Sequence, residues 1–166
     1  MADLIGFISI TLLFLFTLLL AKRFPSISNI LFIALISRVL LIIFGHYITP
    51  LPDSTADART FHFTAVYMSN EGFSYVISRF EGPSPLFISW VLAIPYSLFG
   101  KSILMAQTIS LLFGIGSIIL GWKIACEIWN DKVGRKVAWT IALFPSLALY
   151  SVLVLRETYM VFFLLL

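Results

Sequence analysis

Two apolar runs near the start of the sequence are long enough to cross a lipid bilayer. The first extends from Leu4 to Ala21 without a charged side chain, and the second extends from Ser28 to Ile48 with a single charge, at Arg38. A helix needs about 20 predominantly apolar residues to span the hydrocarbon core of a membrane. Of the 166 residues, 60% are hydrophobic and 11% are charged, far from the balance of soluble domains. The sequence therefore predicts an all-α membrane protein.

The first run has the features of an uncleaved membrane anchor. Asp3 precedes it and the basic pair Lys22-Arg23 follows it directly, whereas a signal peptide carries its positive charges before the apolar stretch. Because lysine and arginine favour the cytoplasmic side, we expect the N-terminus outside and the second run returning outward.

The fold expected from these patterns is a multi-span transmembrane helix bundle with an external loop that carries juxtamembrane helices. The last apolar run stops without a polar flank, so we expect residues 1–166 to be the N-terminal transmembrane portion of a larger, multi-pass protein of the cell membrane. This portion alone should be inactive. The expected spans are residues 4–21, 28–48, 103–125, 137–155 and, incomplete, 158–166.

The external loop, residues 50–102, holds most of the polar side chains. A helical recurrence from Asp57 to Met68 predicts a short helix on the membrane surface, ended by Asn70-Glu71-Gly72. The apolar run from Leu86 to Phe99 follows and has only 14 residues. That length is more typical of an interfacial or re-entrant segment than of a complete span.

The sidedness of the later spans depends on whether the run from Leu86 to Phe99 crosses the membrane. If it does not cross, six basic residues lie inside and four outside; if it does, the numbers are reversed. Since basic residues concentrate in the cytoplasm, we prefer the arrangement without a crossing. Arg156-Glu157 then emerges on the same outer face as Asp57.

Motifs of soluble enzyme chemistry are missing from the sequence. Gly114-Ile115-Gly116 lies within an apolar run, which indicates close helix packing and no phosphate loop. No metal-ligand spacing is present, and the single Cys126 excludes an intrachain disulfide. His46 and His62 are far apart, and a lone histidine near a membrane interface is usually structural. The formal charge of +3 on scattered residues favours contact with anionic membrane lipid over nucleic-acid binding, so we expect no nucleic-acid partner.

Three carboxylates of the outer segments are candidate catalytic groups. Asp57 could take a proton from an acceptor hydroxyl as a general base, or it could simply interact with the first turn of its helix. Asp53 could act in the same way, although aspartate after Pro52 commonly caps a turn. Glu157 could orient an acceptor or a metal, or it could stabilise a helix start.

Three cations need a partner or a ligand. Arg156 or Lys101 could neutralise a phosphate leaving group, because a cation stabilises developing negative charge, while Arg156 could instead reach lipid headgroups. Arg38 lies near the middle of the second span, so it should face the bundle interior and either pair there or contact a lipid phosphate.

The order of several short motifs resembles the GT-C class of polytopic glycosyltransferases, of the aminoarabinose transferase and protein O-mannosyltransferase type. In that class an aspartate of the first external loop is followed by an aromatic residue four positions later and a small residue eight positions later. Next come an apolar segment that begins with proline and ends in Phe-Gly, and then two spans joined by a short basic loop. A further helix that begins with an acidic residue follows. The matching motifs cover roughly Ser28 to the end: Asp57-Ala58-Arg59-Thr60-Phe61 with Ala65, Pro83-Ser84-Pro85-Leu86, Leu98-Phe99-Gly100-Lys101-Ser102, Asn130-Asp131-Lys132, Pro145 and Leu155-Arg156-Glu157.

This resemblance implies transfer of a sugar from a polyprenyl-phosphate donor to a saccharide, lipid or protein acceptor on the non-cytoplasmic face, in cell-envelope glycosylation. Asp57 would be the catalytic base, supported by Asp53 and Glu157. The implied substrate-binding residues are Arg156, Lys101, Arg59 and His62. Family members differ on whether a divalent metal assists, and no ligand set in this sequence decides the matter. The chain departs from the family in its additional first span and in lacking the later spans.

Two other functions share the same ligands. A non-enzymatic carrier or flippase for lipid-linked saccharides would need charges along a path through the spans, and only Arg38 is charged deep within one. A polysaccharide polymerase would need a large loop later in the chain.

Overall fold

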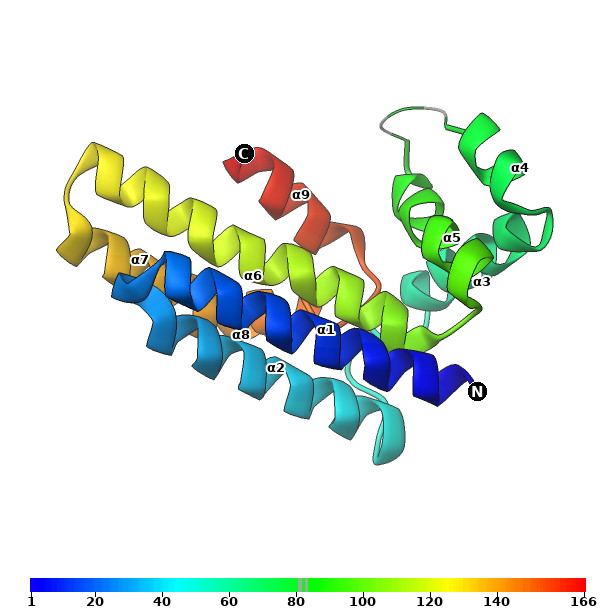
Figure 1. Ribbon diagram of the computed structural model, residues 1–166, viewed down its shortest axis with the longest axis horizontal. Coiled ribbons are helices and arrows are strands. Elements are labelled where there is room, and N and C mark those ends of the chain that lie inside the picture. The colour runs from blue at the N-terminus through cyan, green and yellow to red at the C-terminus, as the bar shows by residue number, and fades with distance from the viewer. Residues whose placement is uncertain (81, 83) are drawn as a thin grey trace.

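The computed structural model describes residues 1–80, 82 and 84–166, and this part of the chain is helical without any strand (Figure 1). Pro83, which belongs to the proline-led motif, lies outside the described residues. The expected all-α fold is confirmed. The helices are α1 (Ala2–Arg23), α2 (Ser28–Tyr47), α3 (Asp57–Asn70), α4 (Phe73–Ser78), α5 (Phe87–Phe99), α6 (Ile103–Ile128), α7 (Asp131–Leu143), α8 (Pro145–Tyr150) and α9 (Arg156–Leu165), with a 3-10 turn at Pro25–Ile27.

Three helices, α1, α2 and α6, are long and apolar enough to cross a membrane, and they cover the first three expected spans. On α1, the side chains of Leu12 and Leu19 are 60% and 63% exposed. Such a surface is costly in water and suits lipid acyl chains. The chain is therefore a membrane protein, while the number of spans stays a prediction.

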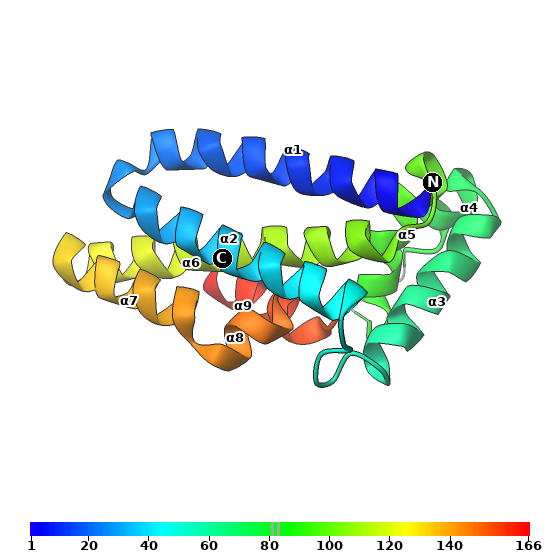
Figure 2. The same ribbon diagram turned by 90° about the horizontal axis from the view of Figure 1, so that it is seen from below.

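Helix α6 forms the centre of the bundle, and α1, α2, α7 and α9 pack around it (Figures 1 and 2). Small residues allow these close approaches. A Cβ added at Gly114 would lie 2.6 Å from Ser151 Cβ, and one added at Gly116 would lie 2.5 Å from the Phe162 ring. The expected packing role of the Gly114-Ile115-Gly116 motif is confirmed.

Helices α3, α4 and α5 form a cap at the end of the bundle where α2 ends and α6 begins (Figures 1 and 2). The predicted surface helix from Asp57 to Asn70 is present as α3, and Gly72, with a φ of 94°, ends it by taking a conformation that favours glycine. In Figure 1, α5 runs across the direction of α6 instead of along it. This placement fits a segment that does not cross the membrane.

The opposite end of the bundle carries the turns between α1 and α2 and between α6 and α7 (Figures 1 and 2). Because these turns lie side by side, one end collects most of the basic side chains. It holds Lys22, Arg23, Lys123, Lys132, Arg135 and Lys136. This distribution is the one expected if that end faces the cytoplasm, and the orientation itself stays a prediction.

The expected span over residues 137–155 is divided. Helix α7 ends at Leu143 and α8 begins at Pro145, and residues 151–155 then run without helix to the start of α9. The break has a local cause, since Pro145 has no N–H to continue the helix and Phe144 before it adopts an extended backbone (φ −62°, ψ 119°).

Candidate functional site

A half-open cavity of about 200 Å³, with a wall of polar and apolar residues, lies where the cap meets the bundle. We call it the cap cavity. Its wall combines the last turn of α2, the coil before α3, one face of α3, the first turns of α6 and the coil before α9. The lining residues are Gly45, His46, Pro50, Ser54, Ala58, Arg59, His62, Ile103, Gln107, Leu153 and Val154.

Two of the predicted substrate-binding residues, Arg59 and His62, line this cavity together. They are three residues apart on α3 and therefore lie on one face of the helix. The fold also brings His46 to the same wall from the end of α2, where its Nε2 lies 3.6 Å from Asp3 Oδ1. The two histidines, distant in sequence, thus share one cavity.

The imidazole of His62 is held by a short chain of hydrogen bonds. Its Nδ1 lies 2.8 Å from the Tyr96 hydroxyl, and that hydroxyl donates to the Ser102 carbonyl at 3.1 Å. A tyrosine hydroxyl has one proton, so with this proton committed to Ser102 it must accept from His62 Nδ1–H. The neutral ring then keeps its lone pair on Nε2. Burial lowers the pKa of His62, which favours this neutral form.

Gln107 was not singled out from the sequence, yet it is the most unusual residue of the wall. Its side chain is 8% exposed, and its Oε1 has no hydrogen-bond partner among the described residues. A buried acceptor without a donor costs about 1–3 kcal/mol. The sequence feature that could have identified Gln107 is a single amide side chain within an otherwise apolar helix.

The predicted carboxylates Asp53 and Asp57 lie beside the cap cavity rather than on its wall. Both are exposed, and they precede the wall residues Ser54 and Ala58 directly. Asp53 adopts a left-handed backbone (φ 61°), which aspartate tolerates in a turn. Asp57 lies in the first turn of α3, and its carboxylate makes no hydrogen bond or ion pair with any residue of the described ranges.

The remaining predicted residues lie elsewhere. Lys101 donates to Asn70 Oδ1 and so joins the start of α6 to the end of α3. Arg156 lines a larger groove of about 540 Å³ between α5 and α9, whose wall is otherwise mostly apolar. Its other lining residues are Ser84, Pro85, Phe87, Ile88, Tyr159, Met160 and Phe163.

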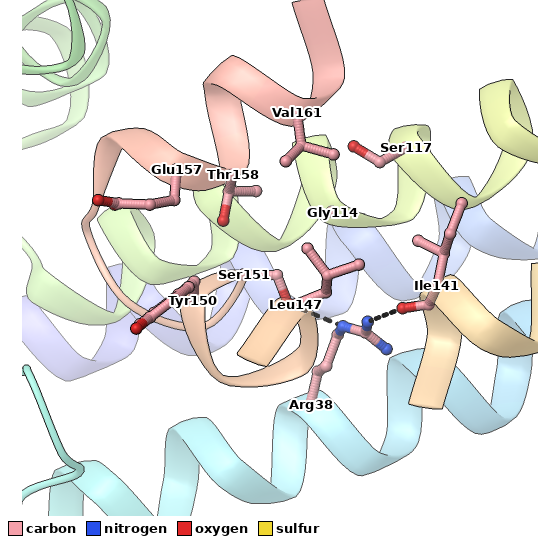
Figure 3. A pocket seen from close by; sticks show the side chains of 10 residues that line it. All are labelled: Arg38, Gly114, Ser117, Ile141, Leu147, Tyr150, Ser151, Glu157, Thr158 and Val161. Atoms are coloured by element: carbon pink, nitrogen blue, oxygen red, sulfur yellow. Dashed lines mark hydrogen bonds between the residues drawn. The ribbon is translucent and has the colours of Figure 1, made fainter. Parts of the chain in front are cut away.

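Glu157 lines a third, small cavity of about 20 Å³ that also contains Arg38 (Figure 3). Figure 3 shows the Glu157 carboxylate pointing away from the guanidinium. The sequence placed Glu157 and Asp57 on one outer face, but in the structure Glu157 contributes to a different cavity from the α3 residues.

Arg38 is 1% exposed and makes four hydrogen bonds inside the bundle. Nε donates to Ser151 Oγ at 2.8 Å, and a terminal nitrogen donates to the Ile141 carbonyl (Figure 3). The other terminal nitrogen donates to the carbonyls of Ala142 and, on its own helix, Ala34. The Ile141 carbonyl would accept from residue 145 in a continuous helix, but Pro145 has no N–H. Arg38 therefore has a structural role, since four hydrogen bonds join its five N–H donors to protein acceptors instead of lipid phosphate.

No cluster of three or more His, Cys, Asp or Glu side chains that could hold a metal ion occurs within residues 1–80, 82 and 84–166. Metal use stays undecided.

Comparison with known proteins returned no match: no family model, no curated protein and no solved structure is similar to this chain. The resemblance to GT-C glycosyltransferases has no support from these comparisons, so function rests on the chemistry of the residues above.

Proposed function

We propose that this chain is part of a membrane glycosyltransferase that transfers a sugar from a polyprenyl-phosphate donor to an acceptor on the non-cytoplasmic face. The proposal is supported by two sites next to one helix: a cavity lined by several polar side chains and a groove lined mostly by apolar ones. α5 contributes Phe87 and Ile88 to the groove that holds Arg156, and its Tyr96 fixes His62 in the cap cavity. A polyprenyl-phosphate sugar has the same two parts, an apolar chain and a polar head.

The groove has the chemistry to bind the lipid end of such a donor. Phe87, Ile88, Met160 and Phe163 offer apolar surface to a prenyl chain. Arg156 is exposed at the same groove and can donate two parallel hydrogen bonds to a phosphate.

In the proposed reaction Asp57 accepts the proton of the acceptor hydroxyl while that oxygen attacks the anomeric carbon. The new glycosidic bond forms as the bond between the anomeric carbon and the phosphate oxygen breaks. The polyprenyl phosphate leaves with the bonding electrons, and Arg156 or Lys101 offsets its negative charge. A single displacement of this kind inverts the anomeric centre. Asp53, which lies beside the cap cavity like Asp57, would support the acceptor, whereas Glu157 lies in a different cavity.

The test compares Asp57→Asn with wild type in membranes that contain the full-length protein. Because asparagine keeps the shape and removes the base, the variant should insert and bind the lipid-linked donor normally, and its transfer rate should fall by about 10²–10⁴-fold. Glu71→Gln is a matched control, since Glu71 is an exposed carboxylate at the other end of α3. Transfer that survives Asp57→Asn unchanged would remove Asp57 from the mechanism.

The carrier hypothesis is less well supported by the structure. A carrier would use charged groups along a path through the spans. Among residues 1–80, 82 and 84–166, Arg38 is the charged side chain buried in the bundle, and its hydrogen bonds go to the protein backbone and Ser151.

A further inference from the structure

The outer face of α7 carries an ordered series of exposed side chains. Lys132, Lys136, Trp139 and Leu143 follow one another at intervals of four, three and four residues, and all four are exposed. This spacing keeps them on one side of the helix. The other side of α7 is buried against α6 and α2, so the exposed series points away from the bundle. We call this face the α7 stripe.

The polarity of the α7 stripe changes along the helix. The start of α7, which carries the two lysines, lies at the basic end of the bundle, and its other end lies nearer the middle (Figures 1 and 2). There Leu143 and its neighbour Phe144 are both exposed. At a rise of 1.5 Å per residue, the first lysine and Leu143 are about 16 Å apart along the helix axis. The stripe therefore passes from charged to apolar over about half the thickness of a bilayer core.

The two lysines of the stripe are free to bind a ligand. They take part in neither of the ion pairs found among the described residues, which are His46–Asp3 and Arg135–Asp131. Arg135, on the same turn of α7, has its Nε 3.2 Å from Asp131 Oδ2, so its charge is partly offset. Two ammonium groups one helical turn apart can both reach one phosphate.

The order of groups along the stripe matches the order of groups in a phospholipid. Lysines donate charge-assisted hydrogen bonds to a phosphodiester. The indole of Trp139 has an apolar ring and one N–H donor, a combination typical of the boundary between headgroups and acyl chains. Leu143 and Phe144 offer apolar surface to an acyl chain. A soluble anion or an acidic protein segment would match the lysines but would leave this apolar surface uncovered.

We propose that the α7 stripe binds an anionic membrane phospholipid. Its phosphodiester lies between Lys132 and Lys136, its glycerol region lies against Trp139, and an acyl chain covers Leu143. The site lies at the end of the bundle opposite the cap and does not depend on the proposed function. The lipid is a bound partner of α7, and no bond in it is made or broken.

Native mass spectrometry of the full-length protein, released from detergent micelles, tests this site by measuring the apparent affinity for added lipid. The probes are phosphatidylglycerol, phosphatidylcholine with the same acyl chains, glycerol 3-phosphate and a short poly-glutamate peptide. We expect phosphatidylglycerol to bind saturably and most tightly of the four. Replacing both lysines, as Lys132→Gln with Lys136→Gln, should weaken its binding by at least about fivefold. Circular dichroism checks that the variants keep the helical fold.

The matched control is Lys22→Gln with Arg23→Gln. This pair removes the same charge from exposed residues at the same end of the bundle, outside the stripe, so phosphatidylglycerol should bind as it does to wild type. Trp139→Ala tests the middle of the stripe and should weaken binding by at least about threefold, because it removes the indole from the glycerol region.

Four results would overturn the inference. Phosphatidylcholine that binds as tightly as phosphatidylglycerol would exclude recognition of the anionic head, a comparison that needs only the wild-type protein. An equal loss in the control pair would show that the charge of the whole end attracts lipid without a site on α7. Glycerol 3-phosphate that binds as tightly as the lipid would make a soluble anion the ligand, and tighter binding of poly-glutamate would indicate an acidic protein partner.

Discussion

Replacing Arg38 with methionine should destabilise the bundle, because it removes the hydrogen-bond donors to the Ile141 and Ala142 carbonyls at the end of α7. Two of the four hydrogen bonds are short, at 2.8 Å to Ser151 Oγ and 2.9 Å to the Ala142 carbonyl, and two are longer, at 3.3 Å. Hydrogen bonds between membrane helices average about 0.6 kcal/mol, and bonds to charged groups reach about 1.5–3 kcal/mol. We expect the free energy of unfolding to fall by about 2–5 kcal/mol.

The assay is reversible unfolding in mixed detergent micelles, followed by circular dichroism, with a double-mutant cycle that includes Pro145→Ala. Alanine at position 145 supplies an N–H for the Ile141 carbonyl, which Pro145 leaves to Arg38. Arg38→Met should therefore cost less in the Pro145→Ala background, by about 0.5–2 kcal/mol. A loss under about 0.5 kcal/mol for Arg38→Met, or a stability that depends on anionic lipid, would refute the structural role of Arg38.

Three further changes test other features of the fold. Gln107→Leu should raise the free energy of unfolding by up to about 1–3 kcal/mol, because it removes a buried acceptor without a partner in the described chain; a thermal melt that moves downward would contradict this. Burial lowers the pKa of His62 from its ordinary 6.5, so its contribution to stability is present above about pH 6.5 and is lost as the pH falls through the lower folded-state pKa. The free energy of unfolding, measured at several pH values, should fall less steeply toward acid pH in His62→Gln than in wild type. An equal pH dependence in the two proteins would refute this contribution of His62. Gly114→Ala should lower the free energy of unfolding by about 1–3 kcal/mol in the same micelle assay, because the added methyl group would meet Ser151. An unchanged stability would show that α6 does not pack closely against the segment that begins at Ser151.

The parts of the structure that the sequence predicted are those written in local patterns. The apolar run from Leu4 to Ala21 lies within α1, and the helical spacing from Asp57 onward gave α3, because hydrophobic length and periodicity are local properties of the chain. Gly114 and Gly116 signalled helix contact because only small residues permit such approach in membranes. The predicted single span over residues 137–155 is wrong, because the missing N–H of Pro145 divides it into α7 and α8.

The candidate site depended on tertiary contacts that no local pattern contains. His62 meets Tyr96, 34 residues later, and Arg38 meets Ser151, 113 residues later. Gln107 lines a cavity only because α2, α3 and the coil before α9 pack around it in the folded chain. Sequence reasoning could select residues with the right chemistry, such as Arg59 and His62, but it could not group them into one cavity or separate them from Glu157.

The sidedness of the bundle can be examined by placing single cysteines at two exposed positions, Glu71 at the end of α3 and Asp131 at the start of α7. The two positions lie at opposite ends of the molecule (Figures 1 and 2). An impermeant maleimide applied to intact cells should label the first and not the second. Labelling of both from outside would mean that α5 crosses the membrane.

The most direct test of the central claim follows the fate of a radiolabelled polyprenyl-phosphate sugar in membranes that contain the full-length protein. A glycosyltransferase moves the label from the lipid to a product that no longer partitions into organic solvent, at a rate that depends on Asp57. If the label instead stays attached to the lipid and only its accessibility from outside changes, the protein moves its ligand without breaking a bond, and the glycosyltransferase proposal is wrong.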